Sequence, residues 1–501
     1  MKTRRTVILL MIVQLAFIIL LRADFLTDWD SYLYTFGALK LHPVGLAGGR
    51  WFFTAFLGSI WRFLNLFHTI SPDSAWLVFS FTTIIFALVN VWLFFSLACR
   101  WIEREAALVA TALFISSPLT GMYGSAVMTE TAALTTLLAT LLILFNQPQS
   151  ILQIVLAGII FGLGCAIREP LVLLAILPLG LIFQYPLPHG CVSFLSKWVR
   201  VSVFLSMIGV VFLLNFLFVL LTAGDWDQIS QSWAMGMARE RMQMIGWLPR
   251  MLVVNFFCLV CWLAIFSPVL LITIPEQIRL FRAKRTFWMI PTLAAGGLYC
   301  VGLIANHSLV FNPRFILFPA ALLCLPAALG LWRKIPVKLQ NPWLIGGLLV
   351  ALHFSAITLF WSVFEGYYFD KSNAARQTWQ TLSYAPNDAL FIPGRLTPAV
   401  ELYKNLHNPD WHIIYAGWDF SDKELMQEIE KSRRANRQTF IVEPQYWAEK
   451  RFRETQYMAL ESVWNRYPHH PCNIAHFSQL DLPPNQAPRE FFRRLINLLF
   501  S

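Results

Sequence analysis

This chain of 501 residues has the composition of a membrane protein. Hydrophobic residues make up 57% of it, aromatic residues 15% and charged residues only 13%, whereas an ordinary soluble chain carries about 25% charged residues. The net charge of +11 would suggest nucleic-acid binding in a soluble protein. However, residues 365–501 hold 16 Lys and Arg against 16 Asp and Glu, so the whole excess lies in the apolar part. Positive loops of a membrane protein report orientation, and we expect no nucleic-acid partner.

Eleven apolar runs predict an all-α membrane bundle. An apolar stretch of about 20 residues crosses a bilayer core. The first run follows the basic residues Met1–Arg5 without a small-x-small cleavage site, so we interpret it as an uncleaved span rather than a signal peptide. The predicted spans are residues 6–22, 76–98, 106–123, 126–145, 151–167, 171–185, 201–222, 251–274, 288–304, 315–331 and 343–362.

The loops between these runs predict the orientation. On one side, about 56 loop residues carry 14 Lys and Arg, while about 100 residues on the other side, mainly 23–75 and 223–250, carry only about eight. Cytoplasmic loops are the positive ones. The N-terminus is therefore predicted in the cytoplasm and the chain after residue 362 outside, because the number of spans is odd.

Residues 363–501 predict a soluble α/β domain beside the membrane domain of residues 1–362. Stretches with strand and helix character alternate in the order Ala389–Pro393, Pro398–Leu406, Trp411–Tyr415, Asp422–Arg434 and Thr439–Val442. Such alternation predicts a small α/β layer. No GxGxxG or P-loop accompanies it. The last stretch, Pro488–Phe500, either lies on the membrane surface or packs on its own domain.

Ionisable residues gather at the outer ends of the predicted spans. Such groups are costly at membrane depth and usually mark function there. The residues are Asp28 and Asp30 after the first span, Glu130 at the start of the fourth, Arg168 and Glu169 after the fifth, Arg239, Glu240 and Arg241 before the eighth, and His307 and Arg314 before the tenth.

Each of these residues also has a purely structural interpretation. The first-loop aspartates fit a solvated loop, and Glu130 suits the first turn of its own helix, where a carboxylate complements the helix dipole. Arg168 fits an ordinary ion pair with a carboxylate such as Glu169. Arg241 fits a solvated helix face, and His307 fits a satisfied interface histidine. These interpretations weaken together, because carboxylates and arginines from distant segments share one side of the membrane.

Carboxylates and arginines at a membrane surface suit the transfer of a sugar from a polyprenyl phosphate. The lipid tail would lie among the spans and its phosphate at the interface. One carboxylate takes the proton from an acceptor hydroxyl as that hydroxyl attacks the anomeric carbon. Arginines stabilise the departing phosphate through charge-assisted, bidentate hydrogen bonds. Because phosphate already leaves well, a separate general acid is unnecessary.

The motifs resemble those of the C-type glycosyltransferase (GT-C) superfamily. They are the long first outer loop with its acidic start, the segment Gly162–Pro170, and Asn312–Phe315 leading into an apolar span with Pro319. The branch they resemble contains the dolichyl-phosphate-mannose protein mannosyltransferases and the bacterial lipid A aminoarabinose transferases. The resemblance covers about residues 1–362. It implies inverting transfer of a hexose or pentose from a dolichyl or undecaprenyl phosphate to a glycan, lipid or protein. We favour a bacterial inner membrane over the endoplasmic reticulum.

The resemblance also implies roles for single residues. The family's first-loop catalytic acid corresponds to Asp30 or Asp28, since this chain has Asp-Trp-Asp where many members have an adjacent Asp-Glu pair. Its acid near the fourth span corresponds to Glu130, which is a candidate catalytic residue together with Asp30 and Asp28. Some relatives use a divalent cation, but two aspartates at i and i+2 without a clear third ligand make us predict no metal and no other cofactor.

The family's lipid-phosphate contacts correspond to arginines of this chain. The Lys or Arg after the glycine-rich pattern matches Arg168. The Arg-Tyr before the tenth span matches Arg314, with Phe315 in place of tyrosine. The candidate substrate-binding residues are therefore Arg168, Glu169, Arg241, His307 and Arg314.

Three other functions remain open from the sequence. The first is transfer of another lipid-linked group, such as phosphoethanolamine or a whole glycan as in O-antigen ligases. The second is lipid transport, although transporters favour midplane polar groups, discontinuous helices and repeats, and these runs hold few charges and no visible repeat. The third is a scaffold that binds a partner through the α/β domain.

Overall fold

The computed structural model describes residues 2–27, 29–41, 50–145, 150–184, 194–223, 249–282, 289–305, 313–359, 370–414, 422–447 and 454–482. The chain divides into two compact units. The helical unit contains residues 1–23 and 33–365, and the sheet unit contains residues 24–32 and 366–501. Each unit is described by itself.

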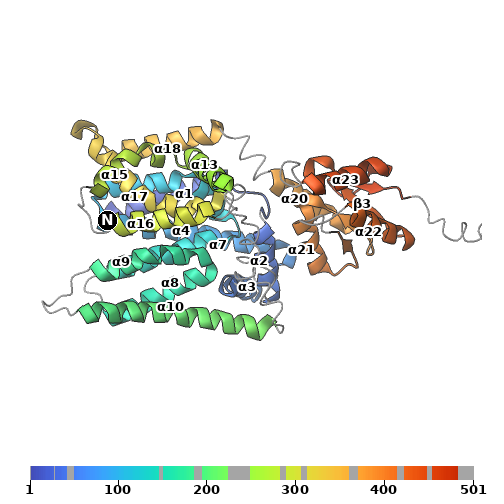
Figure 1. The fold of residues 1–501 in the computed structure, drawn as a ribbon, viewed down its shortest axis with the longest axis horizontal. Helices are drawn as coiled ribbons and strands as arrows, with labels where there is room; N and C mark the ends of the chain where they lie inside the picture. The colour runs from blue at the N-terminus through green and yellow to red at the C-terminus, as the bar shows by residue number, and fades with distance from the viewer. Residues whose placement is uncertain are drawn as a thin grey trace, which may run out of the picture. The chain divides into compact units, whose positions relative to one another are not determined.

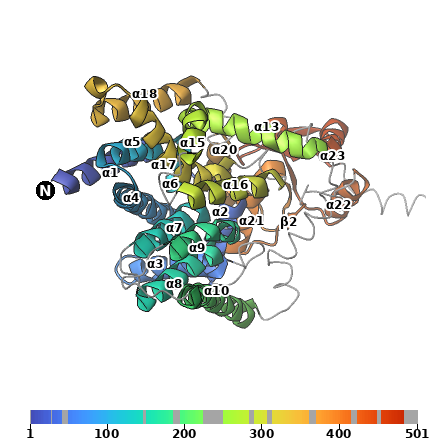
Figure 2. The same cartoon turned by 60° about the vertical axis from the view of Figure 1, so that its left-hand side comes forward.

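The helical unit is built from long helices, and each of the eleven predicted runs overlaps one or more of them (Figure 1). They are α1 (Lys2–Leu20), α2 (Trp29–Lys40, whose first turn is in the sheet unit), α3 (Trp51–Asn65), α4 (Ala75–Trp101), α5 (Arg104–Ser116), α6 (Pro118–Ser125), α7 (Thr129–Phe145), α8 (Ile151–Ile167), α9 (Ile176–Gln184), α10 (Phe194–Ala223), α13 (Pro249–Phe266), α14 (Pro268–Ile272), α15 (Ile274–Arg282), α16 (Met289–Ala305), α17 (Leu317–Lys334) and α18 (Pro342–Leu359). In Figure 2, α8 lies beside α7 and α10, and α17 lies among α5, α15 and α16.

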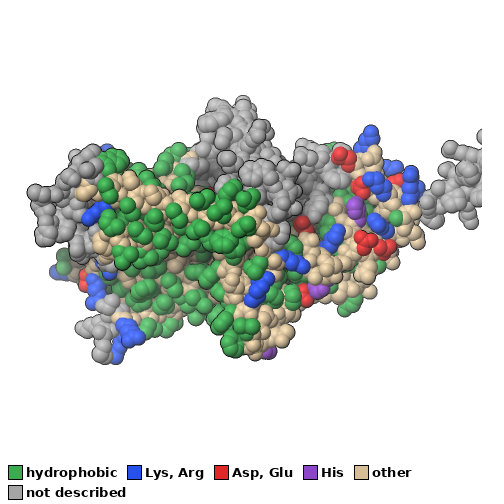
Figure 3. All heavy atoms as spheres, turned by 90° about the horizontal axis from the view of Figure 1, so that it is seen from below, with side chains coloured by type: hydrophobic (Ala, Val, Ile, Leu, Met, Phe, Trp, Pro, Cys, Tyr) green, Lys and Arg blue, Asp and Glu red, His purple; other side chains and the backbone are tan. Residues whose placement is uncertain are grey.

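Four helices among the described residues are long and apolar enough to cross a membrane, or five if the bent pair α5–α6 is one span. Five more apolar helices of 10–17 residues accompany them, within α7, α8, the 3₁₀-helix η3 (Glu169–Ala175) joined to α9, α13 and α16. The number of eleven spans therefore stays a prediction. Hydrophobic side chains cover much of the visible face of the helical unit (Figure 3). Such a surface fits lipid, because contiguous exposed apolar area of this extent is rare on soluble proteins.

Two of the predicted runs are broken rather than continuous. The run 106–123 bends by 58° between α5 and α6, and the run 251–274 breaks between α13 and α14. Both breaks have the sequence Ser-Pro, and proline ends a helix because it lacks a donor and restricts the residue before it. Side chains satisfy freed carbonyl groups: Thr120 Oγ1 donates to Phe114 O over 3.0 Å, and Ser117 Oγ donates to Phe266 O over 3.0 Å. In a membrane interior such compensation is required.

The sheet unit contains a five-stranded mixed sheet with the order β2-β1-β3-β5-β4. Strands β2, β1 and β3 are parallel, and β5 and β4 are antiparallel to their neighbours. The strands are β1 (Leu390–Ile392), β2 (His412–Ile413), β3 (Thr439–Val442), β4 (His469–Pro471) and β5 (Phe477–Leu480), and the helices are α20 (Asp370–Thr381), α21 (Thr397–His407), α22 (Asp422–Arg434) and α23 (Glu454–Arg466). The three predicted strands and two predicted helices are confirmed.

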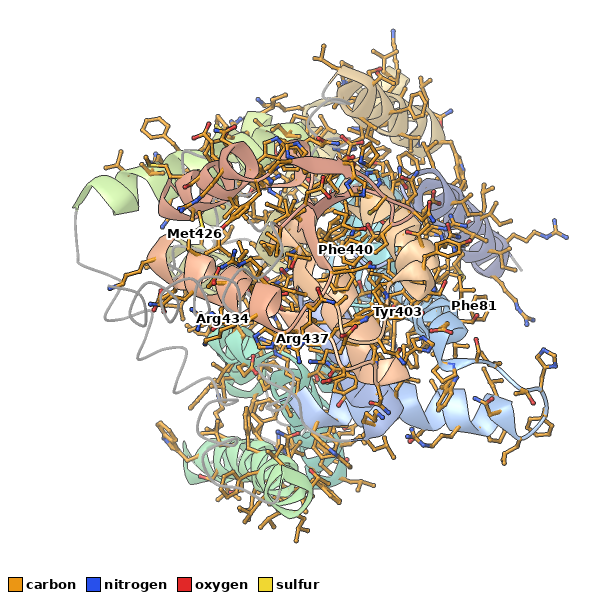
Figure 4. All side chains as sticks on the ribbon, turned by 90° about the vertical axis from the view of Figure 1, so that its right-hand side faces the viewer. Phe81, Tyr403, Met426, Arg434, Arg437 and Phe440 are labelled. Carbon is orange, nitrogen blue, oxygen red and sulfur yellow. The ribbon has the colours of Figure 1, made fainter. Side chains whose placement is uncertain are left out.

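Aromatic side chains fill the core of this sheet. Phe440 of β3 stacks on Phe391 of β1 with ring centroids 5.2 Å apart, and Phe477 of β5 meets Phe391 edge-on. Figure 4 shows Phe440 on its strand, Tyr403 on α21 and Met426 on α22. Both β1 and β3 are buried along their whole length. Because they are buried on both faces, central parallel strands have continuous apolar runs in the sequence. The stretch Pro488–Phe500 lies outside the described residues.

Candidate functional site

Arg168 is placed by the end of α8 and by its close packing on α7. The helix stops at Ile167, and Arg168 has an extended backbone (φ −147°, ψ 98°) before Glu169-Pro170. A Cβ at Gly164 would overlap the side chain of Thr136 on α7, so only glycine permits this approach. The glycine thus brings the end of α8 against α7, the helix whose first turn contains Glu130.

Glu130, Arg168 and Arg314 form one buried cluster. Glu130 is fully buried in the first turn of α7. Its Oε1 lies 3.1 Å from Arg168 Nη2 and 3.3 Å from Arg314 Nε. Neither contact is aligned as a hydrogen bond. Three segments far apart in sequence therefore meet at one carboxylate, and Arg168 and Arg314 are themselves only 2% and 6% exposed.

The ring of Phe315 packs against both arginines of this cluster. The guanidinium carbon of Arg168 lies 4.7 Å from the ring centroid and that of Arg314 lies 5.3 Å from it. Both distances are within the range of cation–π attraction. Phe315 thus holds two like charges side by side in an apolar setting.

A second ion pair joins Arg50 and Glu169. Arg50 Nε lies 3.1 Å from Glu169 Oε1, and Arg50 Nη2 lies 3.0 Å from Oε2, which is a bidentate arrangement. Arg50 also contacts the hydroxyl of Tyr34 on α2. The charge of Arg50 acts on Glu130 as well. The pairing of Arg168 with Glu169 is therefore wrong: Arg168 pairs with Glu130, and Glu169 pairs with Arg50.

Tyr299 of α16 adds an unsatisfied hydroxyl to this region. Its side chain is fully buried, and its hydroxyl has no hydrogen-bond partner among the described residues. The charges of Arg168, Glu130 and Arg314 all act on it. Leaving such a group unpaired costs about 1–3 kcal/mol. Sequence reasoning missed both Tyr299 and Arg50, although a tyrosine inside an apolar run is a signal of the same kind as Glu130.

Three guanidinium groups gather around two carboxylates in this region. Among the described residues they are Arg50, Arg168 and Arg314 beside Glu130 and Glu169, and Arg168 Nε has no hydrogen-bond partner there. Guanidinium groups form charge-assisted hydrogen bonds with phosphate oxygens. The arrangement can therefore bind a phosphate group.

The structure describes only one of the two first-loop aspartates. Asp30 is half-buried in the first turn of α2, within the segment 24–32 of the sheet unit. Asp28, Arg241 and His307 lie outside the described residues. No group of three or more His, Cys, Asp or Glu that could hold a metal occurs in the described part of the chain. The absence of a metal stays a prediction.

Comparisons with known proteins show which fold this chain is similar to. A family model described as dolichyl-phosphate-mannose-protein mannosyltransferase matches residues 60–217. The structure of ArnT from Cupriavidus metallidurans bound to undecaprenyl phosphate is similar with a TM-score of 0.57 and 11% identity, over 95% of this chain and 97% of that one. The search of curated proteins found no significant match.

An archaeal oligosaccharyltransferase is also similar. The oligosaccharyltransferase of Archaeoglobus fulgidus in complex with zinc and sulfate gives a TM-score of 0.55 at 13% identity, over 96% of this chain and 74% of that one. A structure of the same enzyme, AglB, with an inhibitory peptide and a dolichol-phosphate gives 0.52 at 12% identity, over 96% and 75%. This chain therefore has the fold of a multi-pass membrane protein of the GT-C type. The predicted resemblance to that superfamily, in its mannosyltransferase and aminoarabinose-transferase branch, is confirmed.

Proposed function

We propose that this chain is a membrane glycosyltransferase that moves a sugar from a polyprenyl phosphate to an acceptor hydroxyl outside the cytoplasm. The observation that carries the proposal is the buried cluster of Glu130, Arg168 and Arg314, whose two guanidinium groups lie close enough together to bind one phosphate. The similar structures with bound undecaprenyl phosphate and dolichol-phosphate support the same donor class.

The proposed reaction is a single displacement at the anomeric carbon. Asp30, or Asp28 in its place, takes the proton of the acceptor hydroxyl. The acceptor oxygen then forms the new bond to the anomeric carbon, while the bond from that carbon to the phosphate oxygen breaks. The polyprenyl phosphate leaves with the bonding electrons, and the configuration inverts. No metal is needed to balance this step.

Arg168 and Arg314 stabilise the charge that develops on the leaving phosphate. Their planar guanidinium groups offer several donors in a fixed fork. Because the cluster is buried, each interaction is stronger than it would be in water. Glu130 keeps the two arginines in place, and Glu169 does the same for Arg50. Arg241 and His307 remain proposed donor contacts.

Turnover of labelled donors tests the proposal. The purified protein is incubated with undecaprenyl- and dolichyl-phosphate sugars, both hexoses and pentoses, and with membrane extract as the source of acceptor. We expect release of polyprenyl phosphate and transfer of label, both with and without EDTA. Failure of every donor in the presence of extract would contradict the proposal.

Lipid transport is a second candidate function, and the two broken helices favour it. Discontinuous helices are a trait of transporters, where they form substrate sites near the bilayer midplane. The same incubation separates the two functions. A transporter would move the donor across a vesicle membrane without cleaving it, whereas a glycosyltransferase releases the lipid phosphate.

The proposed topology places the N-terminus in the cytoplasm and residues after 362 outside. It rests on the density of Lys and Arg in the loops and on the odd number of predicted spans. We expect a reporter that is active only in the cytoplasm to be silent when fused after Ser501. The same reporter fused before Met1 should be active. A strong signal from the C-terminal fusion would overturn the orientation and the outer position of the site.

Replacing Tyr299 with Phe is expected to weaken donor binding by about 10-fold, since a hydrogen bond to a charged group contributes about 1.5–3 kcal/mol. The ring keeps its packing, and the substitution deletes a buried hydroxyl that has no partner among the described residues. The Tm without donor should therefore hold or rise. Donor affinity and Tm are measured in detergent. Equal donor affinity in both proteins would show that the hydroxyl does not face the donor.

A further inference from the structure

We infer that the sheet unit positions the catalytic segment 24–32 through one face of α20, with Ser372 as the main contact. This inference rests on the proposed function, in which Asp30 or Asp28 is the base. The segment follows directly on α1 and its flanking residues belong to the helical unit. It nevertheless packs within the sheet unit, although more than 330 residues separate it from α20 in the sequence.

One contact of the segment with α20 is a buried hydrogen bond. The backbone N–H of Phe25 donates to Ser372 Oγ over 2.8 Å. Ser372 is fully buried and Phe25 is only 6% exposed. A buried backbone N–H needs a partner, so loss of the hydroxyl would leave this N–H unpaired at a cost of about 1–3 kcal/mol.

Aromatic packing fixes the same segment on both sides of the aspartates. The ring of Phe25 lies 5.6 Å from that of Trp379 and 6.0 Å from that of Tyr32. The hydroxyl of Tyr32 donates to Leu26 O over 3.1 Å. Asp28 and Asp30 lie in the sequence between these two anchors. Phe25 and Leu26 are thus tied to the first turn of α2, in which Asp30 lies.

The contacts of α20 share one helix face. Ser372, Arg376 and Trp379 have the spacing i, i+4, i+7, which places their side chains along one stripe. Arg376 pairs with Asp24 over 3.6 Å, but both side chains are about half exposed or more, and such a pair contributes little. The contacts of the buried Ser372 and the half-buried Trp379 therefore carry most of the interaction.

Other residues of α20 bind the body of the sheet unit. Thr378 Oγ1 donates to Ala475 O over 3.2 Å, and Ala475 N–H donates to Thr381 Oγ1 over 2.9 Å. Ala475 lies two residues before β5. The helix therefore links the sheet to the segment that carries the aspartates. A shift of about 1 Å in a catalytic group can cost about 10²-fold in rate, so this link makes Ser372 a positioning residue.

The test compares Ser372→Ala with Ser432→Ala in the full-length protein. Ser432 is a matched control, because it is a buried serine of the same unit whose hydroxyl bonds to Thr439 Oγ1 over 3.1 Å, away from the segment. We expect Ser372→Ala to lower kcat by about 10–100-fold, with the KM for the lipid donor changed less than about twofold. Ser432→Ala should keep kcat within about twofold of the wild type. Ser372→Thr, which keeps the hydroxyl, should restore most of kcat.

A second variant and a second measurement guard against a folding defect. Trp379→Leu should show the same loss of kcat at constant donor KM. Hydrogen exchange at the Phe25 amide should be faster in Ser372→Ala than in Ser432→Ala. Equal kcat in the two serine variants, in an active wild-type background, would overturn the positioning inference alone. An inactive wild-type protein would instead remove the proposed function, and this inference with it.

Discussion

Replacing Asp30 with Asn is expected to lower kcat by about 10²–10⁴-fold, the usual contribution of a positioned general base. Asparagine has nearly the same size, but its amide cannot take the proton of the acceptor hydroxyl. Asp30 lies half-buried at the start of α2, so the protein level and Tm should change little. The measurement is turnover of the labelled donor at saturating acceptor.

Two further variants make this result specific. Asp28→Asn tests the alternative base, and one of the two variants should carry nearly all of the loss. Asp73→Asn is the matched control, because Asp73 lies in the same outer loop, in the short turn before α4. Its activity should stay within about twofold of the wild type. Near-normal turnover in both Asp28→Asn and Asp30→Asn would end the proposal of a first-loop base.

The fold follows from the sequence where the apolar pattern is long. Each of the eleven runs overlaps at least one described helix, and the strand Thr439–Val442 and the helix Asp422–Arg434 have the predicted limits. The missed elements lack such a pattern. Strand β4 consists of His469, His470 and Pro471, none of them fully buried, and it exists only because β5 pairs with it. Tertiary pairing decides such a strand rather than its own preference.

The candidate site was predictable in its parts but not in its pairing. The side of the membrane and the type of residue singled out Glu130, Arg168 and Arg314. Their convergence on one carboxylate depends on the close packing at Gly164, which no single-sequence pattern contains. The pairing of Glu169 with Arg50 joins a turn to a long loop. The sequence carries no signal for a contact over 119 residues.

Because Arg168 is buried, a purely structural role would also make it important for the stability of the fold. An exposed ion pair contributes about 0–1 kcal/mol, and lysine would replace arginine there without much effect. Arg168 and Glu130 are instead 2% and 0% exposed, and breaking a buried pair costs about 3–5 kcal/mol. Loss of stability alone can therefore not separate the structural role from the phosphate role. The separation has to come from the response to the donor.

Arg168→Lys and Arg314→Lys are expected to weaken binding of the polyprenyl-phosphate donor by about 10–100-fold, because lysine keeps the charge but loses the planar fork and its stacking on Phe315. The measurement is the rise of Tm with donor concentration, since a ligand stabilises the folded state according to its own affinity, whatever the starting Tm. Arg62→Lys is the matched control: Arg62 donates to the carbonyl oxygens of Ala38 and Leu39, outside the cluster. Any effect of Arg62→Lys should be a lower Tm without donor. The rise of Tm with donor concentration should be the same as in the wild type. If the donor raises the Tm of both cluster variants as much as that of the wild type, Arg168 and Arg314 only hold Glu130 in place, and the lipid phosphate binds elsewhere.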